Sequence, residues 1–225
     1  MNIAVIGTGN VGQALGGSLA RAGHSVTFAA RDERKTRSIA SELGARAAAT
    51  AAEAASNADV VVLAVPYAAT DAVAQEIGAQ AAGKIVIDVT NPITPDYSAL
   101  ATAGGPSGAE RVARLFDKAR VVKAFNTVVS SLQAEPTAHG QTLDVLFATD
   151  DEGARARVAE LISSMGFRPI HVGPLASAAE LESLAWLNIR LQMQSGGDWR
   201  SSFVLVGAPE KAVAAEPREL AQLRR

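Results

Sequence analysis

A glycine-rich turn near the amino terminus constrains the fold of this chain more than any other feature. Starting at Gly7, six residues read Gly-Thr-Gly-Asn-Val-Gly, after the apolar run Ile3–Ile6 and before the apolar-periodic segment 10–22. Between a strand and a helix, G-x-G-x-x-G is specific for dinucleotide binding rather than a plain turn. Gly7 permits the tight turn, Gly9 lets backbone amides approach a pyrophosphate, and Gly12 allows close helix–strand packing. The predicted phosphate site consists of Gly7, Thr8, Gly9, Asn10, Val11 and Gly12.

Short β-branched runs alternate with alanine-rich segments of helical length along most of the chain. Strands are expected at Ile3–Ile6, Ser25–Ala29, Asp59–Val65, Lys84–Val89, Arg120–Phe125, Leu143–Ala148 and Phe167–His171, with a weaker one near Ala45–Ala48. Helices are expected at Asn10–Ala22, Glu33–Leu43, Tyr67–Gly78, Arg111–Phe116, Asp151–Met165 and Ala176–Gln194, and a long loop at Asn91–Gly108. This alternation predicts an α/β fold of Rossmann type, with a doubly wound, mostly parallel sheet and a small C-terminal α/β extension.

The amino-acid composition argues against several classes of binding partner. The 225 residues carry a net charge of -2, which gives no basic footprint for nucleic acid. The chain has no cysteine and three scattered histidines, so we expect neither thiolate chemistry nor a metal site. No apolar run approaches the roughly 20 residues of a membrane span. No signal peptide is apparent, and the expected location is the cytoplasm.

The end of the second expected strand indicates which dinucleotide binds. NAD-specific sites place Asp or Glu about 20 residues beyond the glycines, and this chain has Arg31 there, after Ala30. Arginine suits a 2′-phosphate, Lys35 adds a cation one helical turn on, and Thr8 offers a hydroxyl. Asp32 has two interpretations, as a partner of the ribose diol or as the N-cap of the next helix. The sequence therefore favours NADP(H) over NAD(H).

Six motifs together resemble a known family. In chain order they are the glycine-rich turn, Ala30-Arg31, Ala64-Val65-Pro66-Tyr67, Asp88-Val89-Thr90-Asn91-Pro92, Lys123-Ala124-Phe125-Asn126-Thr127 and Val172-Gly173-Pro174-Leu175. They resemble the coenzyme F420-dependent NADP oxidoreductases over roughly residues 1–205. They are also similar to the cytosolic reductase domain of the six-transmembrane epithelial antigen metalloreductases. Lys-Ala-Phe-Asn-Thr and Gly-Pro-Leu are the most telling motifs.

The resemblance implies hydride transfer between NADPH and a deazaflavin or flavin ring held over the nicotinamide. By position it implies that Thr8, Ala30, Arg31 and Lys35 surround the 2′-phosphate, and that Val65, Pro66, Tyr67, Asn91 and Pro92 line the nicotinamide ribose and ring. It further implies that Asn126 and Thr127 face the second ring, with Gly173, Pro174 and Leu175 nearby. Archaeal F420 enzymes carry serine at the position of Ala30 and histidine at that of Asn126. The acceptor therefore stays open among F420, FMN and FAD.

Residue chemistry fits a transfer that needs no general acid or base. No lysine occurs between Lys123 and Lys211, and His139 and His171 are interpreted as structural. Hydride transfer to a flavin-like ring requires stacking, correct distance and exclusion of water. We expect the Asn126 amide to donate to a carbonyl of the acceptor ring. The alternatives are a reductase of a small imine or carbonyl substrate, and a non-catalytic NADP(H)-binding protein.

Two further expectations concern packing and assembly. Lys123, in the middle of a strand, either reaches a cofactor phosphate or, more plausibly, pairs with Asp88. Leucines 181, 184, 187 and 191 form an apolar stripe that is buried on the chain's own sheet or, as we expect, partly in a homodimer contact. The expected organisation is an NADP-binding domain at 1–149, an acceptor-site and dimerisation region at 150–207, and a tail at 208–225.

Overall fold

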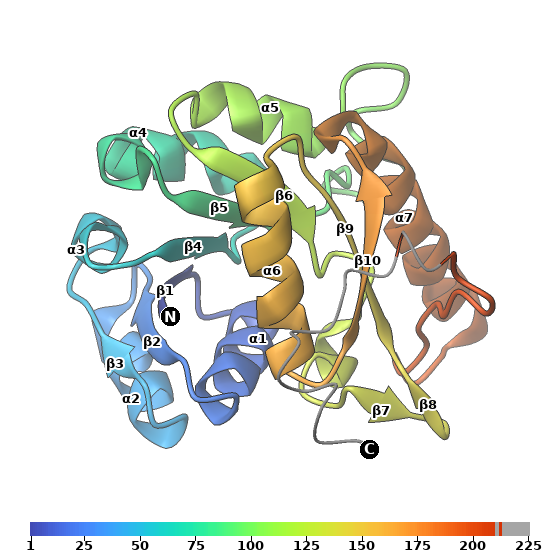
Figure 1. Cartoon of the computed structure of the whole chain (residues 1–225), viewed down its shortest axis with the longest axis horizontal. Helices are drawn as coiled ribbons and strands as arrows, with labels where there is room; N and C mark the ends of the chain where they lie inside the picture. Colours follow the sequence, from blue (N-terminus) through green and yellow to red (C-terminus); the bar gives the residue numbers. More distant parts are fainter. Residues whose placement is uncertain (210–211, 213–225) are drawn as a thin grey trace.

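The computed structural model describes residues 1–209 and residue 212, and a central sheet organises them (Figure 1). Its strands are β1 (Asn2–Ile6), β2 (Ser25–Ala29), β3 (Arg46–Ala47), β4 (Val60–Leu63), β5 (Ile85–Asp88), β6 (Arg120–Ala124), β9 (Asp144–Ala148) and β10 (Arg168–Gly173). They lie side by side in the order β10-β9-β6-β5-β4-β1-β2-β3. The expected strands are thus present, including the weak one that became β3.

The sheet is parallel except at one junction. The strands from β3 to β6 run parallel, β9 and β10 run parallel to each other, and β6 pairs with β9 antiparallel through Lys123 opposite Ala148. This confirms the mostly parallel Rossmann-type sheet. It also confirms the C-terminal extension, because β9 and β10, which run opposite to the other strands, are added after β6. The strand order reverses between β1 and β4, where open α/β sheets form a crevice at the carboxyl ends of the strands.

Helices cover both faces of the sheet. One face carries α1 (Asn10–Arg21), α2 (Glu33–Glu42) and α6 (Glu152–Ser164). The other carries α3 (Ala51–Ser56), α4 (Thr70–Ala81), α5 (Gly108–Leu115) and the start of α7 (Ala178–Ser195). Neighbouring β1 residues belong to opposite layers, Val5 packing with Leu15 of α1 and Ile6 with the cluster of α3 and α4. Burial of both strand faces explains their nearly continuous apolar runs.

Several short elements were absent from the expectations. They are α3, the hairpin of β7 (Thr137–Ala138) and β8 (Gln141–Thr142), and the 3₁₀ turn η2 (Ser130–Leu132). The 3₁₀ turns η1 (Tyr67–Ala69) and η3 (Leu175–Ser177) lie at the starts of the two helices expected at 67–78 and 176–194. Helix α5 begins at Gly108, before the expected Arg111, because Ser107 and Glu110 form a capping box. A side-chain N-cap also starts α3, where the Thr50 hydroxyl accepts from the Glu53 amide at 3.1 Å. Alanine-rich composition hid α3 from a search for apolar periodicity, whereas for α5 only the first turn was missed.

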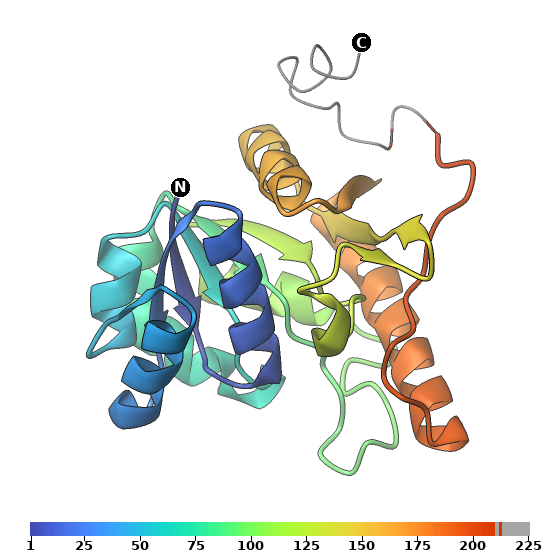
Figure 2. The same cartoon turned by 90° about the horizontal axis from the view of Figure 1, so that it is seen from below.

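The segment after β5 is the long loop expected from its prolines and glycines. Apart from one bridge between Ile93 and Leu100, it has no strand pairing, and Figure 2 shows it (in green) extending away from the sheet. The expected tail at 208–225 lies outside the described residues except for 208, 209 and 212. Within the described part of the chain, no helix is long and apolar enough to cross a membrane. The same part holds no cluster of His, Cys, Asp or Glu suited to a metal ion.

Candidate dinucleotide site

A cleft of about 780 Å³ opens where β1, β2 and β4 end. It lies at the reversal of strand order, where the sheet topology predicts a ligand. Eight of the predicted cofactor residues line it: Gly7, Thr8, Gly9, Ala30, Arg31, Lys35, Val65 and Pro66. The other three members of the glycine-rich motif, Asn10, Val11 and Gly12, form the first turn of α1.

The glycine-rich loop divides its glycines between folding and binding. Gly7 has a φ of +116°, and a Cβ there would lie 2.1 Å from the carbonyl oxygen of Ala64. A Cβ on Gly12 would lie 2.2 Å from the oxygen of Gly7, so both positions are closed by backbone. A Cβ on Gly9 would meet no atom within 4 Å, and Gly9 lines the cleft. The loop thus leaves room for a ligand at Gly9 alone among the three.

Helix α1 presents unpaired backbone donors at the same place. Gly9 is its N-cap and supplies no side-chain hydrogen bond to the first turn. The first N–H groups of a helix lack partners within it and, with the positive end of the dipole, form a site for an anion. The open space at Gly9 and these amides fit a pyrophosphate.

Two cations, Arg31 and Lys35, line the cleft at the end of β2 beside two acids, Asp32 and Glu33. The Asp32 carboxylate accepts from the backbone N–H of Lys35 at 2.9 Å, which confirms its interpretation as the N-cap of α2. Glu33, also on the cleft, pairs with Arg37 at 2.9 Å. Within residues 1–209, no ion pair engages Arg31 or Lys35. Two exposed cations are therefore available to a phosphate beside two acids that already have partners.

Sequence reasoning missed the far wall of the cleft. It is built from α3 and α4 and contributes Thr50, Ala51, Ala69, Ala72, Val73 and Glu76. Glu76 ties the two helices together by accepting from the Ala51 amide at 3.0 Å. The capping signal at Thr50 and Glu53 would have revealed α3, but not its position opposite the glycine-rich loop.

Tyr67 and Pro92, predicted to meet the nicotinamide, both pack against Gly108 at the start of α5. A Cβ on Gly108 would lie 3.0 Å from the Tyr67 ring and 3.3 Å from Pro92. The guanidinium of Arg111, which pairs with Asp71, lies over the Tyr67 ring at 5.5 Å from its centroid. The structure thus brings these two predicted residues together, although they are 25 positions apart in the sequence.

Asn91 and Asn126 form a reciprocal pair across the ends of β5 and β6. The Asn91 amide donates to the Asn126 backbone oxygen at 3.2 Å, and the Asn126 amide donates to Asn91 Oδ1 at 3.0 Å. Asn126 Nδ2 also donates to the Leu181 carbonyl at 3.1 Å. Both amide protons of Asn126 therefore have protein acceptors.

This pairing bears on the role expected for Asn126, which was to donate to the acceptor ring. A donor to the acceptor ring would need a free N–H, and Asn126 has none in this arrangement. Its Oδ1 is buried and has no hydrogen-bond partner in the described part of the chain. Asn126 thus offers an acceptor instead of a donor. The deciding partner, Leu181, is 55 residues away, and no local pattern indicates it.

The remaining predicted acceptor residues lie outside the cleft. Thr127 is buried directly after Asn126. Gly173 ends β10 with a φ of +128°, and Pro174 precedes η3 as its N-cap. The Leu175 amide donates to Asp150 at 3.0 Å, and η3 packs near β6. The Gly173–Leu175 turn is therefore anchored beside β6, which ends two residues before Asn126, and no hydrogen bond joins the turn to Asn126 in the described residues.

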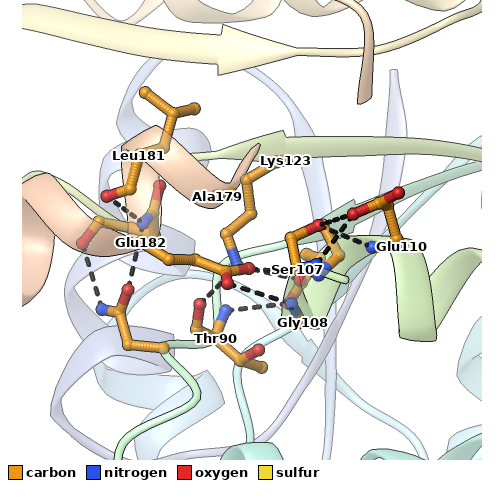
Figure 3. A network of polar contacts seen from close by, with 12 residues as sticks. Thr90, Ser107, Gly108, Glu110, Lys123, Ala179, Leu181 and Glu182 are labelled. Carbon is orange, nitrogen blue, oxygen red and sulfur yellow. Dashed lines mark hydrogen bonds and ion pairs between the residues drawn. The ribbon is translucent and has the colours of Figure 1, made fainter. Parts of the chain in front are cut away.

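Lys123 is fully buried in the middle of β6, and Figure 3 shows its partners. Its ammonium donates to Asp88 at 3.0 Å and to the Thr90 carbonyl at 2.6 Å, and pairs with Glu182 at 3.0 Å. The expected pairing with Asp88 is confirmed, and three partners leave no donor for a cofactor phosphate. Glu182 was not expected, because the α7 sequence does not reveal that this residue faces inward.

The histidines lie away from the cleft. His139 occupies the turn between β7 and β8 with a φ of +50°. The His171 ring packs on Phe147 with 5.2 Å between centroids, and burial lowers the pKa of His171. Burial, followed by the nearby N-terminal charge, also lowers the pKa of His24. These positions agree with structural roles.

Comparison with known proteins places the chain in a family. It is 35% identical over 211 residues to the F420-dependent NADP reductase of Methanothermobacter thermautotrophicus, covering 87% of this chain and 90% of the relative. The chain belongs to the F420-dependent NADP reductase family. The family model for NADP oxidoreductases, coenzyme F420-dependent, matches residues 2–92. A crystal structure of a candidate F420-dependent NADP reductase from Arthrobacter sp. FB24 superimposes with a TM-score of 0.83 at 32% identity, over 91% of this chain and 99% of that one.

This member of the reductase family is also similar to two other kinds of protein. It is 32% identical over 186 residues to the metalloreductase STEAP3 of Rattus norvegicus, covering 81% of this chain but only 36% of that protein. The chain thus spans about a third of the length of that relative. An imine reductase from Aspergillus terreus aligns with a TM-score of 0.66 at 22% identity, over 87% of this chain and 63% of the other. At that identity the likeness shows the fold alone.

Proposed function

We propose that this protein is an NADP(H)-dependent oxidoreductase that transfers hydride between NADP(H) and the deazaflavin F420, with FMN and FAD as alternative acceptors. The observation that carries the proposal is the cleft at the topological switch point, with open space at Gly9 and with the cations Arg31 and Lys35 in its lining. Membership of the F420-dependent NADP reductase family supports the choice of both cofactors.

The residues of the cleft divide the binding task. The Gly9 turn and the first amides of α1 hold the pyrophosphate, while Thr8, Arg31 and Lys35 hold the 2′-phosphate. Val65 and Pro66 continue from the cleft toward the residues that line the nicotinamide, Tyr67, Asn91 and Pro92. When bound, NADPH supplies the hydride.

The residues at the acceptor end of the site orient the two rings and exclude water, and they do not transfer protons. Asn126 Oδ1, buried and unpaired, accepts a hydrogen bond from an N–H of the nicotinamide carboxamide or of the acceptor ring. Thr127 and the Gly173–Leu175 turn border this space. Holding two rings at reacting distance is the main contribution such a site makes, since the cofactors carry the chemistry.

Absorbance at the nicotinamide band tests the proposal directly. NADPH is mixed with the protein and with F420, FMN or FAD, and separately with a cyclic imine and a small ketone. We expect oxidation with a ring acceptor and fastest with F420. Turnover with the imine or ketone alone would assign the protein to the alternative class, and tight NADPH binding without any turnover would indicate a non-catalytic binding protein.

We also propose a homodimer through α7. Leu181 is buried against the chain's own core, whereas Leu187 and Leu191 are 47% and 50% exposed. Beside Leu184 and Leu187, a shallow groove of about 420 Å³ includes Ala179 and Ser183. An exposed leucine stripe along a groove supports a two-fold contact, in which the same surface serves both subunits.

A cytoplasmic location stays a prediction from the sequence. Fractionation of cells that express the full chain with a detectable tag would test it, and recovery of the protein outside the cytoplasmic fraction would contradict it.

A further inference from the structure

Asp88, Lys123 and Glu182 form a buried ion cluster, in which Lys123 pairs with both acids at 3.0 Å; Figure 3 shows Lys123 and Glu182 beside Thr90 and Gly108. We propose that Glu182 is a positioning residue for hydride transfer: through this cluster and the neighbouring Leu181 carbonyl, it fixes Asn91 and Asn126 in the geometry that orients the nicotinamide. This inference rests on the proposed function, which assigns these two asparagines to the nicotinamide and the acceptor.

The first step is the connection from Lys123 to the loop that carries Asn91. Lys123 donates to the Thr90 carbonyl at 2.6 Å, and Asp88 accepts from the Thr90 amide at 2.9 Å. The peptide groups on both sides of Thr90 are therefore held by buried charged groups. Hydrogen bonds to charged groups are stronger than neutral ones, so the backbone entering Asn91 has little freedom.

The second step is the connection from Glu182 to α5. One carboxylate oxygen accepts from the Gly108 amide at 2.9 Å, and the other accepts from the Ala109 amide at 3.1 Å and pairs with Lys123 at 3.0 Å. The cluster holds one cation and two carboxylates. The remaining negative charge lies at the N-terminus of α5. The helix dipole favours it there, as do the first amides of the helix, which have no acceptor within the helix itself. Glu182 thus joins α7 both to the start of α5 and to Lys123 of β6.

The third step is the connection from α7 to Asn126. The residue before Glu182 is Leu181, and its carbonyl accepts from Asn126 Nδ2 at 3.1 Å. That amide also reaches Asn91 Oδ1 at 3.0 Å. A shift of Glu182 moves the Leu181 carbonyl, and with it the hydrogen-bonded pair of asparagines. One turn of α7 therefore reaches the loops after both β5 and β6.

The packing around Gly108 supplies an independent reason. A Cβ there would lie 3.0 Å from the Tyr67 ring, 3.1 Å from Glu182 Oε1 and 3.3 Å from Pro92. The carboxylate of Glu182 is thus separated from two predicted nicotinamide residues by a single residue without a side chain. Ring-to-ring hydride transfer requires reacting atoms within about 3–3.5 Å, so small displacements here affect the rate.

The variant Glu182→Gln tests the proposal, because glutamine keeps the size of the side chain. Three donors point at the carboxylate, and a glutamine must turn its NH₂ toward at least one of them. We expect transfer at saturating NADPH and acceptor to slow at least tenfold, with the NADPH dissociation constant within threefold. The substitution does not touch the residues assigned to the phosphates, so we expect it to lower the transfer rate and not the NADPH affinity. Glu160→Gln, which removes an exposed carboxylate on α6, is the matched control and should behave like the parent.

A second readout does not depend on turnover. The fluorescence lifetime of bound NADPH reports how rigidly the nicotinamide is held, and we expect it to shorten in Glu182→Gln but not in Glu160→Gln. If the parent binds NADPH but reduces neither F420 nor a flavin, the proposed function is wrong. The lifetime comparison would still decide whether Glu182 positions the nicotinamide. Unchanged rate and unchanged lifetime in folded Glu182→Gln would overturn the inference.

Two additional variants distinguish positioning from general destabilisation. If Glu182 acts through the asparagines, the rate losses of Glu182→Gln and Asn126→Ala combine to less than their product, whereas independent effects multiply. Should Glu182→Gln fail to fold, Gly108→Ala applies a one-methyl displacement to Glu182, Tyr67 and Pro92. We expect that variant to fold, to bind NADPH within threefold of the parent and to show the same loss of rate and lifetime. Parent-like values for Gly108→Ala would overturn the inference.

Discussion

The variant Gly9→Ala should separate cofactor binding from folding in the phosphate loop. The added methyl would meet no protein atom within 4 Å and would enter the cleft at the N-terminus of α1. In the parent, this open side allows a pyrophosphate to approach the first amides of the helix. We therefore expect a folded protein with weakened NADPH binding.

The magnitude follows from what the methyl displaces. A hydrogen bond to a charged group contributes about 1.5–3 kcal/mol, so loss of one phosphate contact weakens binding by roughly ten- to 150-fold. The folding cost is smaller, because alanine is a poorer N-cap than glycine by up to about 1 kcal/mol. For a chain of this size, that corresponds to a fall of about 2–4 °C in Tm.

Fluorescence titration with NADPH and thermal unfolding without it would measure the two effects. The control is Gly12→Ala, whose Cβ would lie 2.2 Å from the Gly7 oxygen. Because backbone must move to admit it, Gly12→Ala should lose about 1–3 kcal/mol of unfolding free energy. Parent-like NADPH affinity in Gly9→Ala would refute the placement of the pyrophosphate at this turn.

Three further predictions follow from the charges and surfaces described above. In titrations, the parent should bind NADPH at least tenfold tighter than NADH, and Arg31→Glu should erase or reverse that preference. Equal affinities in the parent would contradict the assignment of Arg31 to the 2′-phosphate. Because its pKa is lowered in the folded state, His24 contributes stability that is present above its ordinary pKa of about 6.5 and is lost as the pH falls toward the folded value. The free energy of unfolding should therefore fall between pH 7.5 and 5.5, and less so in His24→Gln; an identical pH dependence would exclude His24 as a source. Light scattering should give a dimer for the parent and a monomer for Leu191→Glu, and a monomeric parent at micromolar concentration would remove the α7 contact.

Local chemistry in the sequence was sufficient for the sheet and for the glycine-rich turn and cations that line the cleft. Gly12 is closed by the Gly7 oxygen and Gly7 has a φ of +116°, which are local reasons for glycine, although the atom nearest to a Cβ on Gly7 belongs to the distant Ala64. Arg31 follows β2 directly, and parallel strands bring their carboxyl ends to one edge of the sheet. Strand patterns and strand-end residues are therefore informative before any tertiary contact is known.

Tertiary structure decided the other end of the site. The Asn126 amide was expected to donate to the acceptor ring, and no local pattern indicated that it donates to Asn91 and to Leu181. Glu182 looks like an ordinary helical glutamate until α7 packs it against Lys123 and the start of α5. Likewise Leu181 is buried and Leu191 exposed, although both belong to one stripe of leucines. A sequence states which donors, acceptors and apolar surfaces a residue has, whereas their partners depend on where distant segments come to lie.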